Sequence, residues 1–349
     1  MSDTTLGSCP IPFSRYGHIT LGHGSGGELM ADLISGLFVP AFANETLAAL
    51  EDQASLAWNG SRLAFTTDSY VVRPLFFPGG DIGSLAVNGT INDLSVGGAT
   101  PIALSAAFIL EEGLEVALLE RIVRSMARAC SDAGVELVTG DTKVVERGKG
   151  DQVFINTSGI GRIAPGSVLS IASAQPGDRI LVSGTLGDHG IAILSVREGL
   201  AFETTIKSDS APLHTLTRAM LDTCPQIRCM RDLTRGGLSS ALHELAAASD
   251  VGVRLFERDI PLKTEVRAAS EMLGLDPVYI ANEGKLMAIV PEAHAERVLG
   301  VMRAHPLGAD AADIGEIAKD QRRRVVMQSS VGGERVVTRI SGEPLPRIC

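Results

Sequence analysis

The sequence predicts an α+β protein of two domains, and three observations point to this fold class. The chain has 349 residues, which is long for a single domain. Strand-like and helix-like segments follow one another in both halves without the strict alternation of a doubly wound parallel sheet. Residues 164–178, APGSVLSIASAQPGD, carry Pro and Gly at both ends, and we place the domain boundary there.

The first half is expected to hold four strands and one long helix. Residues 111–134 form the clearest helix, because Leu114, Leu118 and Ile122 recur every four residues and Gly134 is a stop signal. Cys130 falls on its apolar side. The strands are expected at 62–72, 101–110 (a buried strand), 135–141 and 152–165, with a glycine-punctuated loop and a short helix over 75–101.

The second half restarts with a strand from residue 179 and a helix from Ile191. Residues 235–249 predict another helix, with Leu238, Leu242 and Leu245 on one face. Further expected elements are strands at 285–291, 313–318 and 322–328 and a helix at 292–305. The predicted organisation is a glycine-rich segment (1–40), a first domain (41–165), a second domain (166–335) and a mobile tail (336–349).

Composition excludes several classes of protein. The net charge of −10 argues against a nonspecific binder of nucleic acid or of an anionic membrane. No apolar run of about 18 residues is present, and the N-terminus lacks the pattern of a secretory signal. Five cysteines, an odd number without paired spacing, fit neither a disulfide framework nor a zinc site. We therefore expect a reduced, cytoplasmic protein.

A glycine-rich loop, LGHGSGGELM, lies at residues 21–30. Gly22, Gly24 and Gly27 match the spacing G-x-G-x-x-G, which alone is a weak signal because no firm strand precedes it. Two interpretations stay open, a flexible turn before a helix and a phosphate-binding loop that uses backbone N–H groups. A Walker-type nucleotide motif is absent from the sequence.

Several aspartates lie at strand ends beside Gly, Thr or Asn. One such aspartate is usually a turn or helix cap. A group of them favours Mg²⁺ shared with substrate phosphates, because Mg²⁺ prefers oxygen ligands. The five candidates are Asp52, Asp68, Asp93, Asp141 and Asp232.

A set of motifs then makes the assignment more specific. HGSGG, EDQA, TTDSYVVRPLFFPGGDIGSLAVNGTINDLSVGGATP, TGDTKVV, GDHG, DLTRGGL, ANEG and the terminal PRIC occur in this order. Together they resemble the carbamoyl dehydratase family of hydrogenase maturation, within the ATP-using superfamily of aminoimidazole ribonucleotide synthetase. EDQA and RDLTRGG differ slightly from the commoner forms DDAA and DPTRGG. The difference bears on the role assigned to Asp52 more than on that of Asp232, which is itself retained.

The resemblance implies a fold and an activity. The fold is PurM-like, with an N-terminal mixed or antiparallel sheet domain, a C-terminal α/β sandwich and a flexible tail. In the family, a HypF-type carbamoyltransferase places a carbamoyl group on the terminal cysteine, here Cys349. ATP-dependent dehydration then gives a thiocyanate, whose cyano group passes to iron in the HypC–HypD complex for [NiFe]-hydrogenase. A homodimer with packed N-terminal sheets is also implied.

The resemblance also implies roles for individual residues, with ATP and Mg²⁺ as cofactors. The expected metal ligands are Asp68, Asp93, Asp141 and Asp232. The expected nucleotide-binding residues are Asp52, Asn92, Gly24, Gly26, His189 and Arg235. The expected catalytic residues are Cys349, Lys143 and the general base Glu283, which Asn282 would orient.

Alternatives stay open for some of these residues and for the function. Asp141 and Lys143 are two apart on a strand and therefore face one side, but Lys143 is also consistent with an exposed strand lysine. His189 fits a phosphate contact or a helix cap, and Arg235 fits a phosphate contact or a surface arginine. Another ATP-dependent ligase or kinase acting on a free small molecule, or a scaffold with a docking tail, remains the alternative function.

The C-terminus fits the role of a carrier. Pro344 and Pro346 disfavour helix and keep the tail extended. At 3.3–3.6 Å per residue, the last ten residues span roughly 33–36 Å. That reach is enough for Cys349 to leave the body, meet a partner enzyme and return to an internal site.

Overall fold

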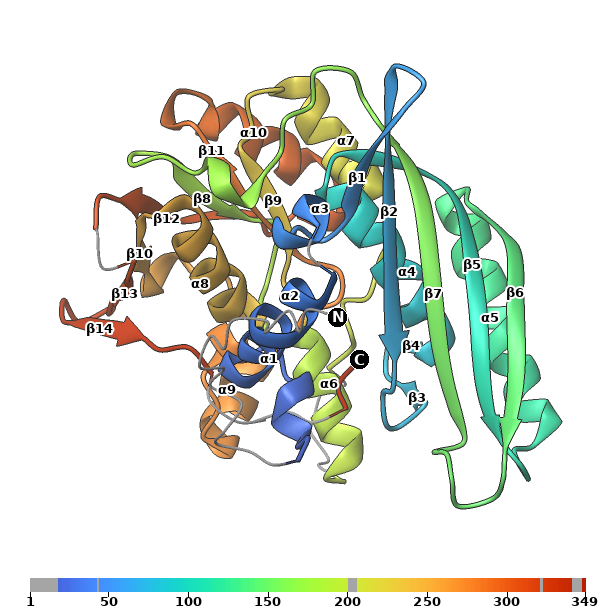
Figure 1. Cartoon of the computed structure of the whole chain (residues 1–349). Coiled ribbons are helices and arrows are strands. Elements are labelled where there is room, and N and C mark those ends of the chain that lie inside the picture. Colours follow the sequence, from blue (N-terminus) through green and yellow to red (C-terminus); the bar gives the residue numbers. More distant parts are fainter. Residues whose placement is uncertain (1–17, 43, 200–205, 321–322, 341–346) are drawn as a thin grey trace, which may run out of the picture.

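The computed structural model describes residues 18–42, 44–199, 206–320, 323–340 and 347–349. Two sheet-and-helix units lie side by side, the first drawn at the right of Figure 1 and the second at the left. The C-terminus lies where the two units meet, between α6 and β2 (Figure 1). In the described part of the chain, no helix is long and apolar enough to cross a membrane.

The first unit is a five-stranded sheet with helices on one face. Its strand order is β1 (Ala54–Trp58), β2 (Ser61–Tyr70), β7 (Val153–Ile163), β5 (Ala99–Glu111), β6 (Glu136–Val145). All neighbours pair antiparallel except β5 and β6, which are parallel. The helices α4 (Ile82–Val96) and α5 (Val116–Ala133) pack behind it. The expected mixed sheet is confirmed.

The two helices differ from their sequence predictions in different ways. The long helix is confirmed as α5 and ends at Gly134, whose φ of 66° is left-handed. It begins at Val116 rather than at residue 111, because Glu111 is the last residue of β5. The short helix expected within 75–101 is wrong in length, since α4 has 15 residues and an N-cap carboxylate from Asp81.

The strand expected to be buried, β5, is buried on one face only. Leu104 and Ala106 point into the core beneath α4 and α5, whereas Ile109, an odd number of residues along the strand, is 44% exposed. Alternate residues of a strand face opposite sides, so a sheet covered on one side exposes every second side chain. The outer face of this sheet is therefore open in the protomer.

The second unit is a seven-stranded sheet with helices on both faces. Its order is β14 (Glu334–Val337), β13 (Val325–Gln328), β10 (Gly252–Phe256), β12 (Ala312–Ala318), β8 (Arg179–Val182), β11 (Leu286–Val290), β9 (Cys229–Asp232). Only β10 and β13 are parallel among these neighbours. One face packs on α8 (Gly237–Ser249), and the other on α7 (His214–Thr223) and α10 (Glu292–Ala304). The expected α/β sandwich is confirmed.

Strand alternation explains why both faces are covered. On β8, Ile180 and Val182 belong to the cluster under α8, whereas Leu181 belongs to the cluster under α7 and α10. Leu238 and Leu242 of α8, which the sequence placed on one helix face, are fully buried. Burying a Leu or Ile side chain contributes about 1.5–3 kcal/mol, so this double-sided core is the main stabilising feature of the second unit.

Short elements connect and flank the two units. The N-terminal segment holds a 3-10 turn (Leu21–Gly24), α1 (Glu28–Leu33), a π-type turn (Ile34–Phe38), α2 (Val39–Phe42) and α3 (Glu45–Ala48). The hairpin β3 (Phe76–Phe77) and β4 (Gly80–Asp81) precedes α4. The helices α6 (Asp188–Arg197) and α9 (Thr264–Leu273) complete the second unit, and α6 begins three residues before the predicted Ile191.

Candidate active site

Two of the predicted carboxylates lie on neighbouring elements of the first unit. Asp68 is on β2 and Asp93 is on α4. Thr66 and Asp68 are two apart on the strand and therefore share the face that looks toward the helix. The Thr66 hydroxyl donates a 2.7 Å hydrogen bond to Asp93 Oδ2, which holds this carboxylate against the sheet.

Asp232 joins them from the second unit, at the end of β9. We call Asp68, Asp93 and Asp232 the carboxylate cluster. Burial raises the pKa of Asp232 to about 7, with Asp68 adding to the rise and Arg231 opposing it. Burial, followed by repulsion from Asp232 and Asp68, also raises the pKa of Asp93. If all three carboxylates were ionised, the cluster would hold more negative charge than its surroundings compensate.

This charge balance fits a divalent cation that is shared with a phosphate. Within the described ranges, no group of at least three His, Cys, Asp or Glu side chains converges into a complete ligand set. Mg²⁺ commonly takes only one or two protein carboxylates and completes its shell with water and substrate phosphates. The cluster therefore offers the carboxylate part of such a site, and a nucleotide would supply the remaining oxygens.

Asp52 is held differently from the cluster. Arg231 Nη2 lies 3.0 Å from Asp52 Oδ1 and 2.6 Å from Glu244 Oε2. Burial raises the pKa of Asp52, and Arg231 opposes this rise. Asp52 thus links the first unit to the second through a buried ion pair, a role that its neighbours in the sequence did not reveal.

Glu283 lies on a buried turn just before β11, near the carboxylate cluster. Its side chain is 2% exposed, and Oε1 has no hydrogen-bond partner. Burial, then Asp232, Asp209 and Asp68, raises the pKa of Glu283 well above its usual 4.5, and Arg235 opposes this. A buried carboxylate with a raised pKa is a stronger proton acceptor when ionised than one in water, which suits a general base.

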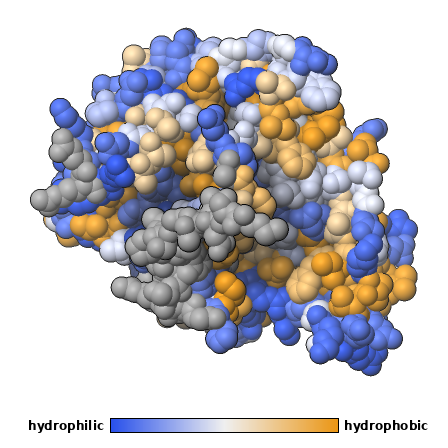
Figure 2. Space-filling view, in the orientation of Figure 1, coloured by the Kyte–Doolittle hydropathy of each residue, from blue (hydrophilic) through white to orange (hydrophobic). Residues whose placement is uncertain are grey.

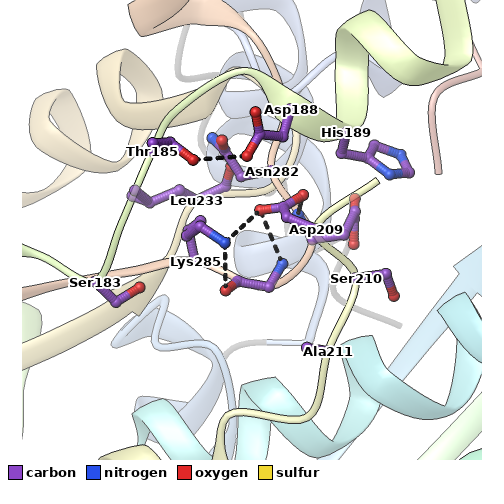
Figure 3. Close-up of polar contacts among 12 residues, drawn as sticks. Ser183, Thr185, Asp188, His189, Asp209, Ser210, Ala211, Leu233, Asn282 and Lys285 are labelled. Atoms are coloured by element: carbon purple, nitrogen blue, oxygen red, sulfur yellow. Dashed lines mark hydrogen bonds and ion pairs between the residues drawn. The ribbon is translucent and has the colours of Figure 1, made fainter. Parts of the chain in front are cut away.

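The turn that carries Glu283 is fixed by its backbone. Asp209 accepts hydrogen bonds from the Glu283 N–H at 3.1 Å and the Gly284 N–H at 3.4 Å, and it pairs with Lys285 at 3.4 Å. Figure 3 shows Asp209 and Lys285 meeting at this turn. Asn92 Nδ2 donates to the Glu283 carbonyl at 3.1 Å. The turn that carries Glu283 is therefore held from both units.

Asn282, the residue before Glu283, also forms hydrogen bonds to the main chain through its side chain. Its Oδ1 accepts a 2.7 Å hydrogen bond from the Gly187 N–H, and its Nδ2 donates to the Leu233 and Ile280 carbonyls. Asn282 lies next to Leu233 in Figure 3. It ties the Glu283 turn to the segment after Asp232, so it fixes the backbone of the turn that carries Glu283.

Cys349 lies inside this same site. The thiol is buried, and burial raises its pKa, with Arg235 opposing and Glu283, Asp68 and Asp232 reinforcing the rise. The sulfur therefore lies within electrostatic reach of Glu283 and of the carboxylate cluster. The mobile-tail prediction falls partly on residues 341–346, which lie outside the described residues, whereas residues 347–349 are docked.

Arg235 and the glycine-rich loop form the wall beside the thiol. Arg235 Nη1 donates to the Gly24 carbonyl at 3.2 Å, and its Nη2 lies 3.9 Å from Asp68 Oδ1. Gly26 has φ of +76°, and a Cβ there would lie 2.6 Å from the Arg235 carbonyl oxygen. Gly24, Arg235 and Cys349 line a cavity of about 160 Å³. The loop predicted to bind phosphate thus adjoins the thiol.

Asp141 and Lys143 do not join the site within one protomer. They lie on β6 and pair with each other at 2.7 Å, with both side chains largely exposed. The register places Asp141 beside Ala107, and Ala107 beside Asn156, on the outer face of the sheet. Asp68 faces the opposite side. The two-residue spacing was interpreted correctly, but the shared face is the one remote from Glu283.

His189 takes a third role that the sequence did not suggest. It is fully buried in the first turn of α6, and its Nε2 lies 2.8 Å from the Ile348 carbonyl oxygen. It therefore contacts the tail instead of an N-terminal helix group. Asp209 and Tyr70 were not predicted at all; the buried Tyr70 hydroxyl has its pKa raised by burial and by Asp68, Asp93 and Glu283.

Comparison with known proteins defines the class first. Residues 50–163 match the N-terminal domain of the AIR synthase related proteins, and residues 175–328 match the C-terminal domain. The chain is 58% identical over 335 residues to the carbamoyl dehydratase HypE of Azotobacter vinelandii, with 96% of this chain and 98% of that protein covered. The chain belongs to the HypE family of carbamoyl dehydratases, which confirms the resemblance that the motifs indicated.

Two solved structures agree with this assignment. HypE in a HypE–HypF complex superposes with a TM-score of 0.84 at 47% identity, covering 88% of this chain and 99% of that one. HypE in complex with ATP superposes with a TM-score of 0.80 at 48% identity, covering 95% of this chain and 100% of that one. The PurM-like two-domain fold expected from the sequence is confirmed.

Proposed function

We propose that this chain dehydrates an S-carbamoyl group on its own Cys349 to a thiocyanate at the expense of ATP. One observation carries the proposal: the terminal thiol lies buried among Glu283, Arg235 and the carboxylate cluster. An enzyme acting on a free small molecule would have no need to bury its last residue there. The alternative of a superfamily kinase or ligase is therefore not favoured.

The reaction balances as an S-carboxamide plus ATP giving a thiocyanate, ADP and phosphate. ATP supplies a phosphoryl group that converts the amide oxygen into a good leaving group. The two N–H protons are lost, one as the oxygen is phosphorylated and one as the C–O bond breaks and C≡N forms. Glu283 is the proposed acceptor at the nitrogen, because its buried carboxylate lies within electrostatic reach of the thiol that carries the group.

The remaining residues have supporting roles in the proposal. Asp68, Asp93 and Asp232 would hold Mg²⁺ with the nucleotide phosphates, and Arg235 would steady negative charge near Cys349. Gly24 and Gly26 would offer their backbone to the nucleotide, beside Arg235. Asp52 and Asn92 would act by joining the two units around this site.

Asp141 and Lys143 enter the proposal through a homodimer. The outer face of the first sheet exposes Leu56, Trp58, Phe65, Ile109 and Ile160, each by more than 40%. Figure 2 shows apolar residues among polar ones on the side of the molecule that carries β2, β7, β5 and β6. We propose that two such faces pack together and bring Asp141 and Lys143 of each protomer toward the site of the other.

A mixing experiment tests this arrangement. Lys143→Ala and Glu283→Gln protomers are each expected to be inactive alone. Re-associated together, about half the dimers are mixed and hold one intact site of two, so about a quarter of wild-type activity should return. No return of activity, with dimers formed normally, would place Lys143 outside the partner's site.

The proposed partners are a HypF-type carbamoyltransferase, which loads Cys349, and a HypC–HypD complex, which receives the cyano group. A HypE structure in complex with HypF supports the first of these. We place the protein in the cytoplasm, where reducing conditions suit the free cysteines found at Cys130, Cys224, Cys229 and Cys349.

The test of the proposed function combines the protein with its carbamoyltransferase, carbamoyl phosphate and MgATP, followed by mass analysis of the C-terminal peptide. We expect a carbamoyl adduct on Cys349 that loses one water only when ATP is present. ATP hydrolysis with an unmodified Cys349 would overturn the proposal.

A further inference from the structure

The last three residues are docked along a short stretch of the first unit. The Val71 N–H donates to the Cys349 carbonyl at 3.1 Å, and the Arg73 N–H donates to the Arg347 carbonyl at 3.2 Å. Arg347 Nε donates a 3.1 Å hydrogen bond to the Val71 carbonyl. Because Val71 and Arg73 bond to alternate tail residues, the tail adds to this stretch in the manner of an extra strand.

The middle tail carbonyl faces the other way and is met by α6. His189 Nε2 lies 2.8 Å from the Ile348 carbonyl oxygen, and His189 Nδ1 lies 2.8 Å from Ser208 Oγ. A carbonyl only accepts, so Nε2 carries the proton and Nδ1 accepts from Ser208. Burial lowers the pKa of His189, which keeps the ring in this neutral, tail-binding form.

The other end of α6 contributes a second clamp. Arg197 Nη2 donates to the Arg347 carbonyl at 2.8 Å and to the Arg73 carbonyl at 2.6 Å. The guanidinium thus joins the tail to the stretch on which it is docked. Both α6 contacts go to tail main-chain oxygens, so they do not depend on which side chains residues 347 and 348 carry.

Side-chain contacts complete the docking. Ile348 is 3% exposed and belongs to the apolar cluster that includes Ile193 and Ala281. Arg347 forms an ion pair with Asp151, which also lies 3.6 Å from Arg73. We call this arrangement around residues 347–349 the tail seat. It buries the thiol, so a carbamoyltransferase cannot reach Cys349 until the tail leaves the seat.

We propose that His189 and Arg197 are positioning residues that hold the tail in its seat through main-chain carbonyls and so set how often Cys349 is exposed. The effect of the tail on loading and dehydration rests on the proposed dehydratase function. The contacts that hold the tail are read from the structure and do not depend on that function. Neither side chain needs to touch the nucleotide. A buried carbonyl that loses its hydrogen-bond donor is left unsatisfied, which costs free energy. Removing either donor therefore destabilises the docked tail and raises the population of the undocked tail.

The first experiment measures exposure without ATP or a partner. The protein is treated with iodoacetamide, and alkylation of the C-terminal peptide is followed by mass spectrometry. The buried thiol reacts only when undocked, since its pKa is raised in the seat. His189→Ala and Arg197→Met should speed alkylation by about 2- to 13-fold, which corresponds to one lost hydrogen bond.

Three further variants make this test specific. His189→Gln keeps an N–H at the end of the side chain and should restore slow alkylation. Arg124→Met is the matched control, because Arg124 pairs with Glu120 on the exposed face of α5 and should leave alkylation unchanged. Ile348→Ala loosens the tail without altering the body and should speed alkylation. Unchanged alkylation in His189→Ala, Arg197→Met and Ile348→Ala would overturn the tail seat.

The second experiment separates positioning from nucleotide binding. On pre-carbamoylated protein, His189→Ala should slow dehydration by up to about 13-fold, the upper limit for one lost hydrogen bond. The KM for MgATP should stay at the wild-type value. A rise in that KM with unchanged alkylation would show that His189 serves the nucleotide, and would overturn the proposal. If the wild-type protein dehydrates nothing while the alkylation pattern holds, the proposed function fails and the tail seat stands.

Discussion

Replacing Glu283 with Gln is expected to stabilise the fold at neutral pH while it slows dehydration strongly. The carboxylate is buried with Oε1 unpartnered, and its pKa is raised first by burial and then by Asp232, Asp209 and Asp68. The folded protein therefore holds a proton on Glu283 more tightly than the unfolded chain does. The ionised side chain costs stability, and this cost grows as the pH rises from 4.5 toward the folded-state pKa.

The size of the effect follows from the same burial. Each unit of pKa rise corresponds to about 1.4 kcal/mol, and a buried unsatisfied polar group costs about 1–3 kcal/mol. Gln keeps the shape and loses the charge but remains polar, so we expect a gain of about 1–2 kcal/mol at pH 8. Loss of a general base slows a reaction by about 10²–10⁴-fold, which is the expected loss in dehydration.

Urea unfolding of both proteins at pH 8 and at pH 4.5 measures this gain. The gain should be largest at pH 8 and should fall to about 0.4 kcal/mol or less at pH 4.5, where the wild-type side chain is protonated in the folded protein and half protonated in the unfolded chain. Glu120→Gln, on the exposed face of α5, is the control and should change stability by less than about 0.5 kcal/mol. A Glu283→Gln protein that is less stable at pH 8, or equally stabilised at both pH values, would refute this reasoning.

Three other variants test the carboxylates and the glycine-rich loop. Asp93→Asn should raise the KM for MgATP at least tenfold, and a KM at the wild-type value would remove Asp93 from the proposed cation site. Asp52→Ala removes one of the two carboxylates paired with the buried Arg231, and should cost about 3 kcal/mol in urea unfolding; a loss under 1 kcal/mol would contradict a structural ion pair. Gly26→Ala places a Cβ 2.6 Å from the Arg235 carbonyl at φ of +76°, so thermal unfolding should show at least about 1 kcal/mol of destabilisation, and an unchanged midpoint would contradict the close packing of the loop.

Hydrophobic periodicity predicted α5 well and α4 poorly, for a physical reason. α5 is covered on one side only, so its apolar residues recur every three or four positions. α4 is buried nearly all round between the first sheet, α5 and the second unit, so no polar face marks it as a helix. Its glycines looked like breakers, yet Gly89 is needed because a Cβ there would lie 2.1 Å from Tyr70 Oη.

The candidate site was predictable where motifs named residues and not where tertiary pairing decides the role. Asp68, Asp93, Asp232, Glu283 and Cys349 come from distant parts of the chain and lie near one another, as the motifs implied. In contrast, nothing local to Asp209 or Arg231 marks them, because their role depends on partners about 70 and 180 residues away.

The outer-face position of Asp141 and Lys143 illustrates a further limit. A strand pattern shows that residues two apart share a face. It does not show which face meets the site, because that depends on how the sheet packs against its helices. Here α4 and α5 cover the face that bears Asp68 and leave the face of Lys143 open, so Lys143 does not reach the site of its own protomer.

The central claim is that Cys349 carries the group on which the body of the protein acts. Mass analysis of the C-terminal peptide tests it most directly, on protein loaded by its carbamoyltransferase and then given MgATP. The account predicts that the carbamoyl adduct loses the mass of one water with wild-type protein and persists in Glu283→Gln. A carbamoyl adduct that survives MgATP in the wild-type protein would contradict it.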